Sequence, residues 1–192
     1  MTLIINITVQ NRCPDSHRPM FFRISEQIDR FTGLSNISLG EVSMKRPNWF
    51  QISAEGGKAM GAMHHYATTM TNLPAELIHL VFLRVSQING CAHCIDIHTR
   101  DLIKSGMSVE KIVLIPVWRE AAYLFSDVER AALSWAEEVT RISETHASDE
   151  AYSAALSVFG EKDLVELTIV IATMNAINRM GISYRMKPLA KA

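Results

Sequence analysis

From Lys45 onward the chain is a succession of helix-start and helix-stop signals separated by only a few residues. Ser126 followed by Glu129 has the pattern of a capping box, in which each side chain accepts a hydrogen bond from the other's backbone N–H. Gly90 and Gly106 follow apolar stripes of helical spacing, as glycines do at helix C-termini. No alternating apolar and polar stretch typical of a strand interrupts this part. The pattern predicts an all-α domain in which short turns join antiparallel helices.

The same signals divide the chain into an N-terminal extension and one helical domain. Residues 1–43 mix proline and glycine with short apolar stretches and show no sustained period, so we interpret them as a weakly structured extension. Cys13 is expected to be a spectator thiol within it. Residues 44–192 form the domain. Within that domain we expect seven helices, at residues 55–69, 74–88, 91–105, 108–115, 126–144, 148–159 and 162–180, with Gly181 ending the last.

Composition excludes several classes of protein. Apolar residues make up 48% of the chain and charged residues 20%, which is enough to bury a core without structural disulfides. The formal net charge of −1 gives no overall attraction to nucleic acid or to anionic lipid. The apolar runs are shorter than the roughly 20 residues that cross a bilayer, and no secretory signal is recognisable. We therefore expect a soluble, cytoplasmic protein with no nucleic-acid or membrane partner.

The most informative motif is Cys91-Ala92-His93-Cys94-Ile95-Asp96-Ile97-His98. It places two thiols in the first turn of a helix, where exposed backbone N–H groups and the helix dipole lower a thiol pKa. Cys94 and His98 are four residues apart, so the imidazole can accept the thiol proton. Cysteines three apart can also close a disulfide after one thiolate has attacked a peroxide or another disulfide. The motif predicts thiol redox chemistry.

Two other interpretations of the cysteine pair remain. The thiols could simply pack in a core, or Cys91, Cys94 and His98 could be three ligands of a zinc ion. A structural zinc site usually needs a fourth ligand, and no second close pair of cysteines or histidines supplies it, because the adjacent His64 and His65 would point about 100° apart on a helix. We therefore expect no metal and no cofactor other than a redox-active Cys91–Cys94 disulfide.

Several further motifs accompany the cysteines, and together they resemble the alkylhydroperoxidase D-like proteins of the carboxymuconolactone decarboxylase superfamily. The resemblance covers roughly residues 44–185. Its motifs are Lys58-Ala59-Met60, Leu83-Arg84-Val85-Ser86-Gln87-Ile88-Asn89-Gly90-Cys91, Trp118-Arg119-Glu120-Ala121, Glu129-Arg130-Ala131-Ala132-Leu133 and Asn175-Ala176-Ile177-Asn178-Arg179. Similar proteins often begin near the residue matched by Met44, so residues 1–43 are either a real extension or the product of a mis-assigned start codon.

The resemblance implies a bundle of about six to seven helices with the CxxC at the start of a central helix, assembled as a trimer or hexamer. It implies that Cys94 attacks a hydroperoxide or disulfide, that Cys91 resolves the intermediate and that His98 relays the proton. His93 also matches a histidine with a role in the family. A dithiol, thioredoxin-type or lipoyl-type reductant would restore the pair.

One position departs from the family pattern. The relay glutamate of the family lies twelve residues before the first cysteine, where this chain has His79. Either His79 replaces the carboxylate, or Glu76 one turn earlier reaches the site, or the peroxidase activity is weak.

The sequence is also compatible with two functions of other kinds. One is a structural, metal-binding or redox-sensing oligomer. The other is lactone decarboxylation, which the CxxC pair disfavours because the decarboxylases do not rely on such a pair.

Asn175, Asn178 and Arg179 place polar groups in an apolar helix, and they need partners from a cap, another subunit or the helix that carries the cysteines.

Overall fold

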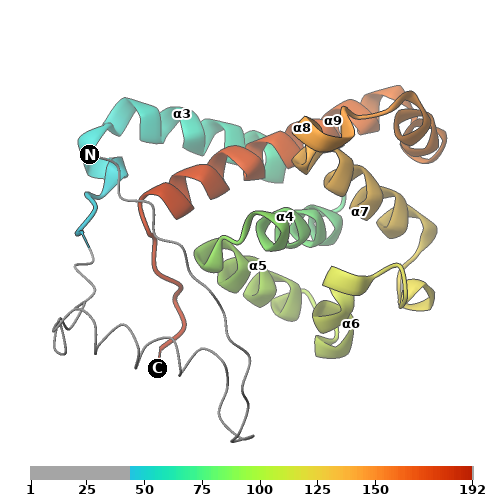
Figure 1. Ribbon diagram of the computed structural model, residues 1–192, viewed down its shortest axis with the longest axis horizontal. Helices are drawn as coiled ribbons and strands as arrows, with labels where there is room; N and C mark the ends of the chain where they lie inside the picture. The colour runs from blue at the N-terminus through green and yellow to red at the C-terminus, as the bar shows by residue number, and fades with distance from the viewer. Residues whose placement is uncertain (1–43, 192) are drawn as a thin grey trace, which may run out of the picture. The chain divides into compact units, whose positions relative to one another are not determined.

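Helix α4 (Ala75–Asn89) is the centre of a helical bundle in a computed structural model that describes residues 44–191 (Figure 1). It packs against α5 (Ala92–Lys104), α7 (Asp127–Thr140) and α9 (Asp149–Ser183). Its side chains are buried almost all round, and Leu80, Val81 and Phe82 are fully buried. A helix that is buried on almost every face is stable only inside a protein, and α4 accordingly lies between α5, α7 and α9.

The remaining elements cover this centre. They are α2 (Trp49–Ile52), α3 (Ala54–His65), a π-helical turn (Tyr66–Met70), α6 (Val109–Leu114), two 3-10 turns (Ile115–Val117 and Ala122–Leu124) and α8 (Ile142–Thr145). No strand occurs among residues 44–191. The all-α fold expected from the sequence is confirmed. The predicted extension, residues 1–43 with Cys13, lies outside the described residues.

The capping signals act as expected at two positions. The Ser126 hydroxyl accepts a hydrogen bond from the Glu129 backbone N–H, and a Glu129 carboxylate oxygen accepts one from the Ser126 N–H. Gly90 adopts the left-handed conformation (φ 75°), which ends α4 and turns the chain into α5. This turn brings the cysteines to the start of α5.

Two expected helix boundaries are wrong. The predicted helix 126–144 is interrupted at Arg141, which separates α7 from α8. Gly181 does not end the last helix, which continues to Ser183 because Gly181 packs against the cysteines, as described below. The predicted break between helices 148–159 and 162–180 is confirmed, because Gly160 has a non-helical φ of 69° and a kink there divides α9 into two helices.

A buried ion-pair network ties α4 to α7. The Glu137 carboxylate is almost fully buried and accepts hydrogen bonds from the Arg84 guanidinium at 2.8 and 2.6 Å and from the Trp118 indole at 3.0 Å. Arg119 pairs with its second oxygen. Burial alone would raise the pKa of Glu137, but the Arg119, Trp118 and Arg84 donors outweigh it and hold the pKa below its usual value. The carboxylate therefore stays charged and fixes three partners.

The described helices differ from membrane-spanning ones. Within residues 44–191, no helix combines the length and the apolar character that crossing a bilayer requires.

Removing Glu137 should destabilise the fold, because its loss leaves the buried Arg84 guanidinium without a counter-charge. We expect Glu137→Ala to lower the free energy of unfolding by about 3–5 kcal/mol, as measured by urea denaturation. Glu144→Ala, at an exposed position of α8, is the control and should change it by less than about 0.5 kcal/mol. Equal effects of the two substitutions would contradict a stabilising role for the network.

Candidate active site

The two cysteines occupy the N-terminal turn of α5. Cys91 is the N-cap residue and Cys94 lies in the first helical turn. Both thiols are reduced and buried, with exposed fractions of 1% and 3%. The Cys91 backbone N–H donates to the Ser86 carbonyl at 3.0 Å, which fastens the start of α5 to the end of α4. The sequence prediction of two thiols at a helix start therefore agrees with the geometry.

A set of buried polar side chains from α4 and α9 surrounds the thiols. The Asn178 amide donates to the Ser86 hydroxyl at 3.0 Å, and its oxygen accepts from Asn89 at 3.0 Å. Asn178 also acts to lower the pKa of both thiols, and Ser86 acts to lower that of Cys94. Asn178 is fully buried. Its hydrogen-bond partners therefore include two residues at the end of α4, next to the cysteine turn.

The two neighbouring polar residues of α9 extend this set. Asn175 donates to the Thr140 hydroxyl at 3.2 Å and accepts from Asn89 at 3.0 Å. Arg179 donates to the Asn175 carbonyl at 2.8 Å. Their polar groups are thus satisfied within the chain.

The thiols share one proton. The Cys94 thiol donates a hydrogen bond to Cys91, and this bond, although opposed by burial, lowers the pKa of Cys91 to about 6, against an ordinary 9.0. The same bond, together with burial, raises the pKa of Cys94. The pair therefore loses its first proton at a lower pH than an isolated thiol and holds its second more tightly.

Gly181 allows α9 to pass close to the sulfurs. A Cβ atom built at Gly181 would lie 3.0 Å from the Cys91 Sγ and 3.8 Å from the Cys94 Sγ. A larger residue would fit only if the Cys91 sulfur moved by a few tenths of an ångström. This glycine therefore serves close packing within a continuing helix and does not mark the end of one.

His98 is buried next to the thiols, with an exposed fraction of 5%. Its Nδ1 lies 3.4 Å from the Asp101 Oδ2. Burial and the nearby His79 lower the pKa of His98 to about 4, although the Asp101 carboxylate opposes the shift. The imidazole is neutral at pH 7 and can accept a proton. No hydrogen bond joins it to Cys94 within residues 44–191, so the i, i+4 spacing brings the groups near each other without direct bonding.

His79 faces the same carboxylate from α4. Its Nδ1 lies 3.5 Å from the Asp101 Oδ2, and its ring centroid is 5.7 Å from that of His98. Glu76, the alternative acid, is exposed in the first turn of α4. The histidine at the departing position thus lies beside His98, whereas Glu76 does not reach the site.

His93 lies on the other side of the cysteine turn. Its Nδ1 donates to the backbone carbonyl of Lys187 at 2.7 Å. Asp96, one turn later, accepts from the backbone N–H groups of Leu189 and Ala190 at 2.7 and 3.0 Å. These contacts fasten the C-terminal segment to α5, so His93 has a structural partner in addition to its place beside the site.

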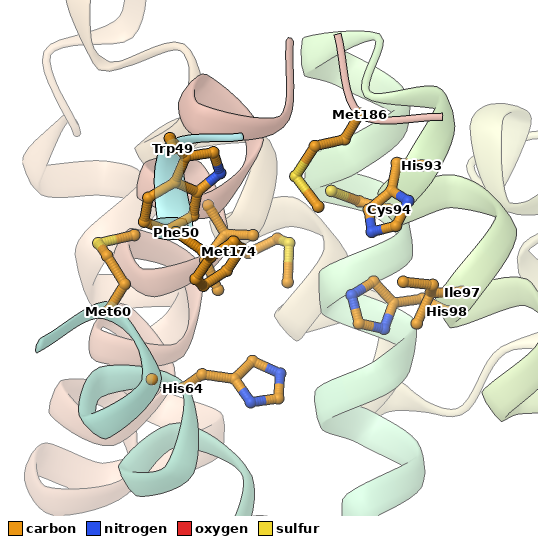
Figure 2. A pocket seen from close by; sticks show the side chains of 12 residues that line it. Trp49, Phe50, Met60, His64, His93, Cys94, Ile97, His98, Met174 and Met186 are labelled. Atoms are coloured by element: carbon orange, nitrogen blue, oxygen red, sulfur yellow. The ribbon is translucent and has the colours of Figure 1, made fainter. Parts of the chain in front are cut away.

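A mainly apolar cavity of about 350 Å³ adjoins the cysteine turn. Figure 2 shows Cys94, His93 and His98 on one wall, with Trp49, Met60 and His64 on the facing wall. Its lining residues are Trp49, Phe50, Met60, Gly61, His64, His93, Cys94, Ile97, His98, Met174, Ile177 and Met186. Of the two cysteines, Cys94 lines this cavity and Cys91 does not.

Sequence reasoning missed two residues of the site, Asp101 and Gly181. Asp101 follows His98 by three residues on the same helix, and that spacing was a usable signal. Gly181 gave no such signal, because its role depends on contact with a turn ninety residues away.

The close approach at Gly181 leads to a prediction. Glycine-to-alanine substitution inside a helix usually stabilises by roughly 0.5–1 kcal/mol. We expect Gly61→Ala in α3, where a Cβ would meet nothing within 4 Å, to show this gain in urea denaturation. Gly181→Ala should gain nothing and should slow alkylation of the thiols, because its Cβ displaces the Cys91 sulfur. Equal gains for both variants would contradict the proposed steric role.

The shared proton leads to a second prediction. Cys94→Ala removes the S–H donor, so the pKa of Cys91 should rise from about 6 toward 9.0, and less thiolate should be present at pH 7. The measurement is the pH dependence of alkylation by a small reagent, with Cys13→Ser as the background in both proteins. An unchanged apparent pKa would show that the pair does not share a proton.

Comparison with known proteins identifies the family of the chain. The model of the carboxymuconolactone decarboxylase family matches residues 54–138, which include both cysteines and His98. The uncharacterized protein YdfG of Bacillus subtilis strain 168 is 33% identical over 147 residues, covering 77% of this chain and 99% of that protein. The uncharacterized protein YnjA of Escherichia coli K12 is 34% identical over 103 residues, covering 53% of this chain and 55% of that protein.

Solved structures show the same fold. A crystal structure from Agrobacterium tumefaciens, of a protein of unknown function described as a candidate antioxidant defence protein AhpD, matches with a TM-score of 0.73 and 35% identity. It covers 77% of this chain and 99% of that one. An uncharacterized peroxidase-related protein from Silicibacter sp. TM1040 matches in fold, with a TM-score of 0.65 and 19% identity over 90% of this chain and 86% of that one. The chain therefore belongs to the carboxymuconolactone decarboxylase family, as one of its alkylhydroperoxidase D-like members.

Proposed function

We propose that the protein is a thiol-dependent peroxidase or disulfide oxidoreductase that works through Cys91 and Cys94. The observation that carries this proposal is a pair of free, buried thiols at the start of a helix, one of which, Cys94, lines an apolar cavity. The lowered pKa of Cys91 agrees with it. Two thiols that merely filled a core would need no such cavity. The candidate antioxidant description of the Agrobacterium protein is consistent with this activity.

The proposed reaction begins at Cys94, because its sulfur borders the cavity. Transfer of the shared proton to Cys91 or to His98 leaves a Cys94 thiolate, which attacks the terminal peroxide oxygen. The O–O bond breaks, Cys94 becomes a sulfenic acid and the other oxygen leaves as an alcohol after protonation. Cys91 then attacks the Cys94 sulfur and displaces water, forming the Cys91–Cys94 disulfide. A hydroperoxide and two thiols thus give an alcohol, water and a disulfide.

The buried histidine supplies the base. His98 lines the cavity and its Nδ1 is directed toward Asp101, so Nε2 is the nitrogen available to Cys94. Its pKa of about 4 keeps it neutral at pH 7, so the ring holds the thiol proton only transiently and passes it to the leaving oxygen. His79 and His93 have secondary roles, His79 beside His98 and His93 in holding the C-terminal segment over the site.

The cavity favours substrates with an apolar portion. Its wall is made mainly of tryptophan, phenylalanine, methionine and isoleucine side chains, which would bind the organic part of a hydroperoxide or disulfide.

We propose a dithiol of thioredoxin or lipoyl type as the reductant and a homo-oligomer as the working form. We propose the cytoplasm as the location, because reductants of this type keep thiols reduced there.

Thiol titration before and after one equivalent of an organic hydroperoxide tests the proposal. In a Cys13→Ser background we expect both remaining thiols to be lost. Cys94→Ser should remove the reaction, and His98→Ala should slow it by about 100-fold or more. His65→Ala, at an exposed histidine of α3, is the matched control and should react like its parent. An unchanged thiol count in the parent would exclude the peroxidase reaction.

A further inference from the structure

Three metal-binding groups meet beside the thiol pair, on α4 and α5. They are one ring nitrogen each of His79 and His98 and a carboxylate oxygen of Asp101, and these three atoms all lie within 4.8 Å of one another. We propose that these three residues form a binding site for one divalent transition-metal ion of the zinc type. The proposal goes beyond the thiol chemistry described above and uses neither cysteine as a ligand.

The separations fit ligands of a common ion. The Asp101 Oδ2 lies 3.5 Å from the His79 Nδ1 and 3.4 Å from the His98 Nδ1. Both distances exceed the usual 2.7–3.2 Å range of an N–H···O hydrogen bond. Two ligands held about 2.0–2.2 Å from a zinc ion at a tetrahedral angle lie about 3.3–3.5 Å apart. The carboxylate oxygen and each imidazole nitrogen are therefore placed as neighbouring ligands would be.

The nitrogens also lack other partners. The Nδ1 atoms of His79 and His98 are both buried, and neither has a hydrogen-bond partner within residues 44–191. The His98 side chain as a whole is more than nine-tenths buried. Buried polar atoms are rarely left unpaired in native proteins, and an ion is one of the standard ways in which they are satisfied. Two such atoms directed at one carboxylate oxygen point to a cation between them.

The donor set selects the class of ion. Imidazole nitrogen binds zinc, cobalt and related transition metals well, whereas magnesium and calcium prefer sites made entirely of oxygen. Two imidazoles and one carboxylate leave a fourth position for water, as in catalytic zinc sites. The zinc site suggested by the sequence used Cys91, Cys94 and His98 as ligands. The set proposed here shares only His98 with that site.

Binding would also affect the thiols, a consequence that rests on the proposed function. A metal ion on Nδ1 of a neutral imidazole leaves the ring proton on Nε2. That nitrogen could then no longer accept a proton from Cys94. The ion would therefore slow the thiol reaction, and a chelator would restore its rate.

Cobalt(II) is a suitable probe, because its visible absorption reports ligand type and geometry. We would titrate it into the untagged full chain carrying Cys91→Ser and Cys94→Ser, so that thiol chemistry contributes nothing to the readout. We expect one ion per chain and visible bands of a four-coordinate site. In the parent chain with intact thiols, the same spectrum should appear without a thiolate-to-cobalt charge-transfer band.

Two ligand variants complete the test. His79→Gln and Asp101→Asn preserve size and polarity, and each should weaken binding by more than about tenfold, since even outer-shell partners contribute about 10- to 100-fold. His65→Gln, at an exposed histidine, should bind like its parent. Loss of binding in the double serine chain, or unchanged affinity in both ligand variants, would overturn the proposed site. Neither result would bear on the peroxidase proposal, which the thiol count tests separately.

Discussion

The close packing of α9 against the turn between α4 and α5 determines the geometry of the site. Gly181 permits this contact because a side chain there would collide with the Cys91 sulfur. Asn178, three residues earlier, hydrogen-bonds Ser86 and Asn89 at this interface and acts to lower the pKa of both thiols. One helix therefore supplies both the close packing and the polar groups that surround the buried cysteine pair. Without these polar groups, burial would act to raise the pKa of both thiols with less opposition.

Burial then gives the neighbouring groups their chemical character. The hydrogen bond between the thiols favours a thiolate on Cys91, while burial keeps the His98 imidazole neutral. Asp101 places a negative charge between His98 and His79. The result is a thiol pair, a neutral imidazole and a carboxylate in successive turns of α5, with His79 of α4 beside them and an apolar cavity on one side. The proposed reduction of a hydroperoxide by two thiols would use these groups.

The sequence predicted those features that depend on neighbours along the chain. Gly90 as a helix end, the capping box at Ser126 and the spacing of Cys94 and His98 all follow from local rules. It did not predict features that depend on contacts between distant segments. Gly181 has the local pattern of a helix end, yet its helix continues because tertiary packing requires a small residue there. The cavity likewise joins Trp49 to residues of α5 and α9, which no periodicity reveals.

The central claim is that Cys91 and Cys94 act together as one redox unit. Peptide mass mapping of the full chain, alkylated before and after one equivalent of an organic hydroperoxide, tests it most directly. The account predicts that the peptide containing both cysteines becomes two hydrogens lighter and resists alkylation, while the Cys13 peptide remains alkylated. A bond between Cys13 and either cysteine, or an oxidised Cys94 that never pairs with Cys91, would contradict it.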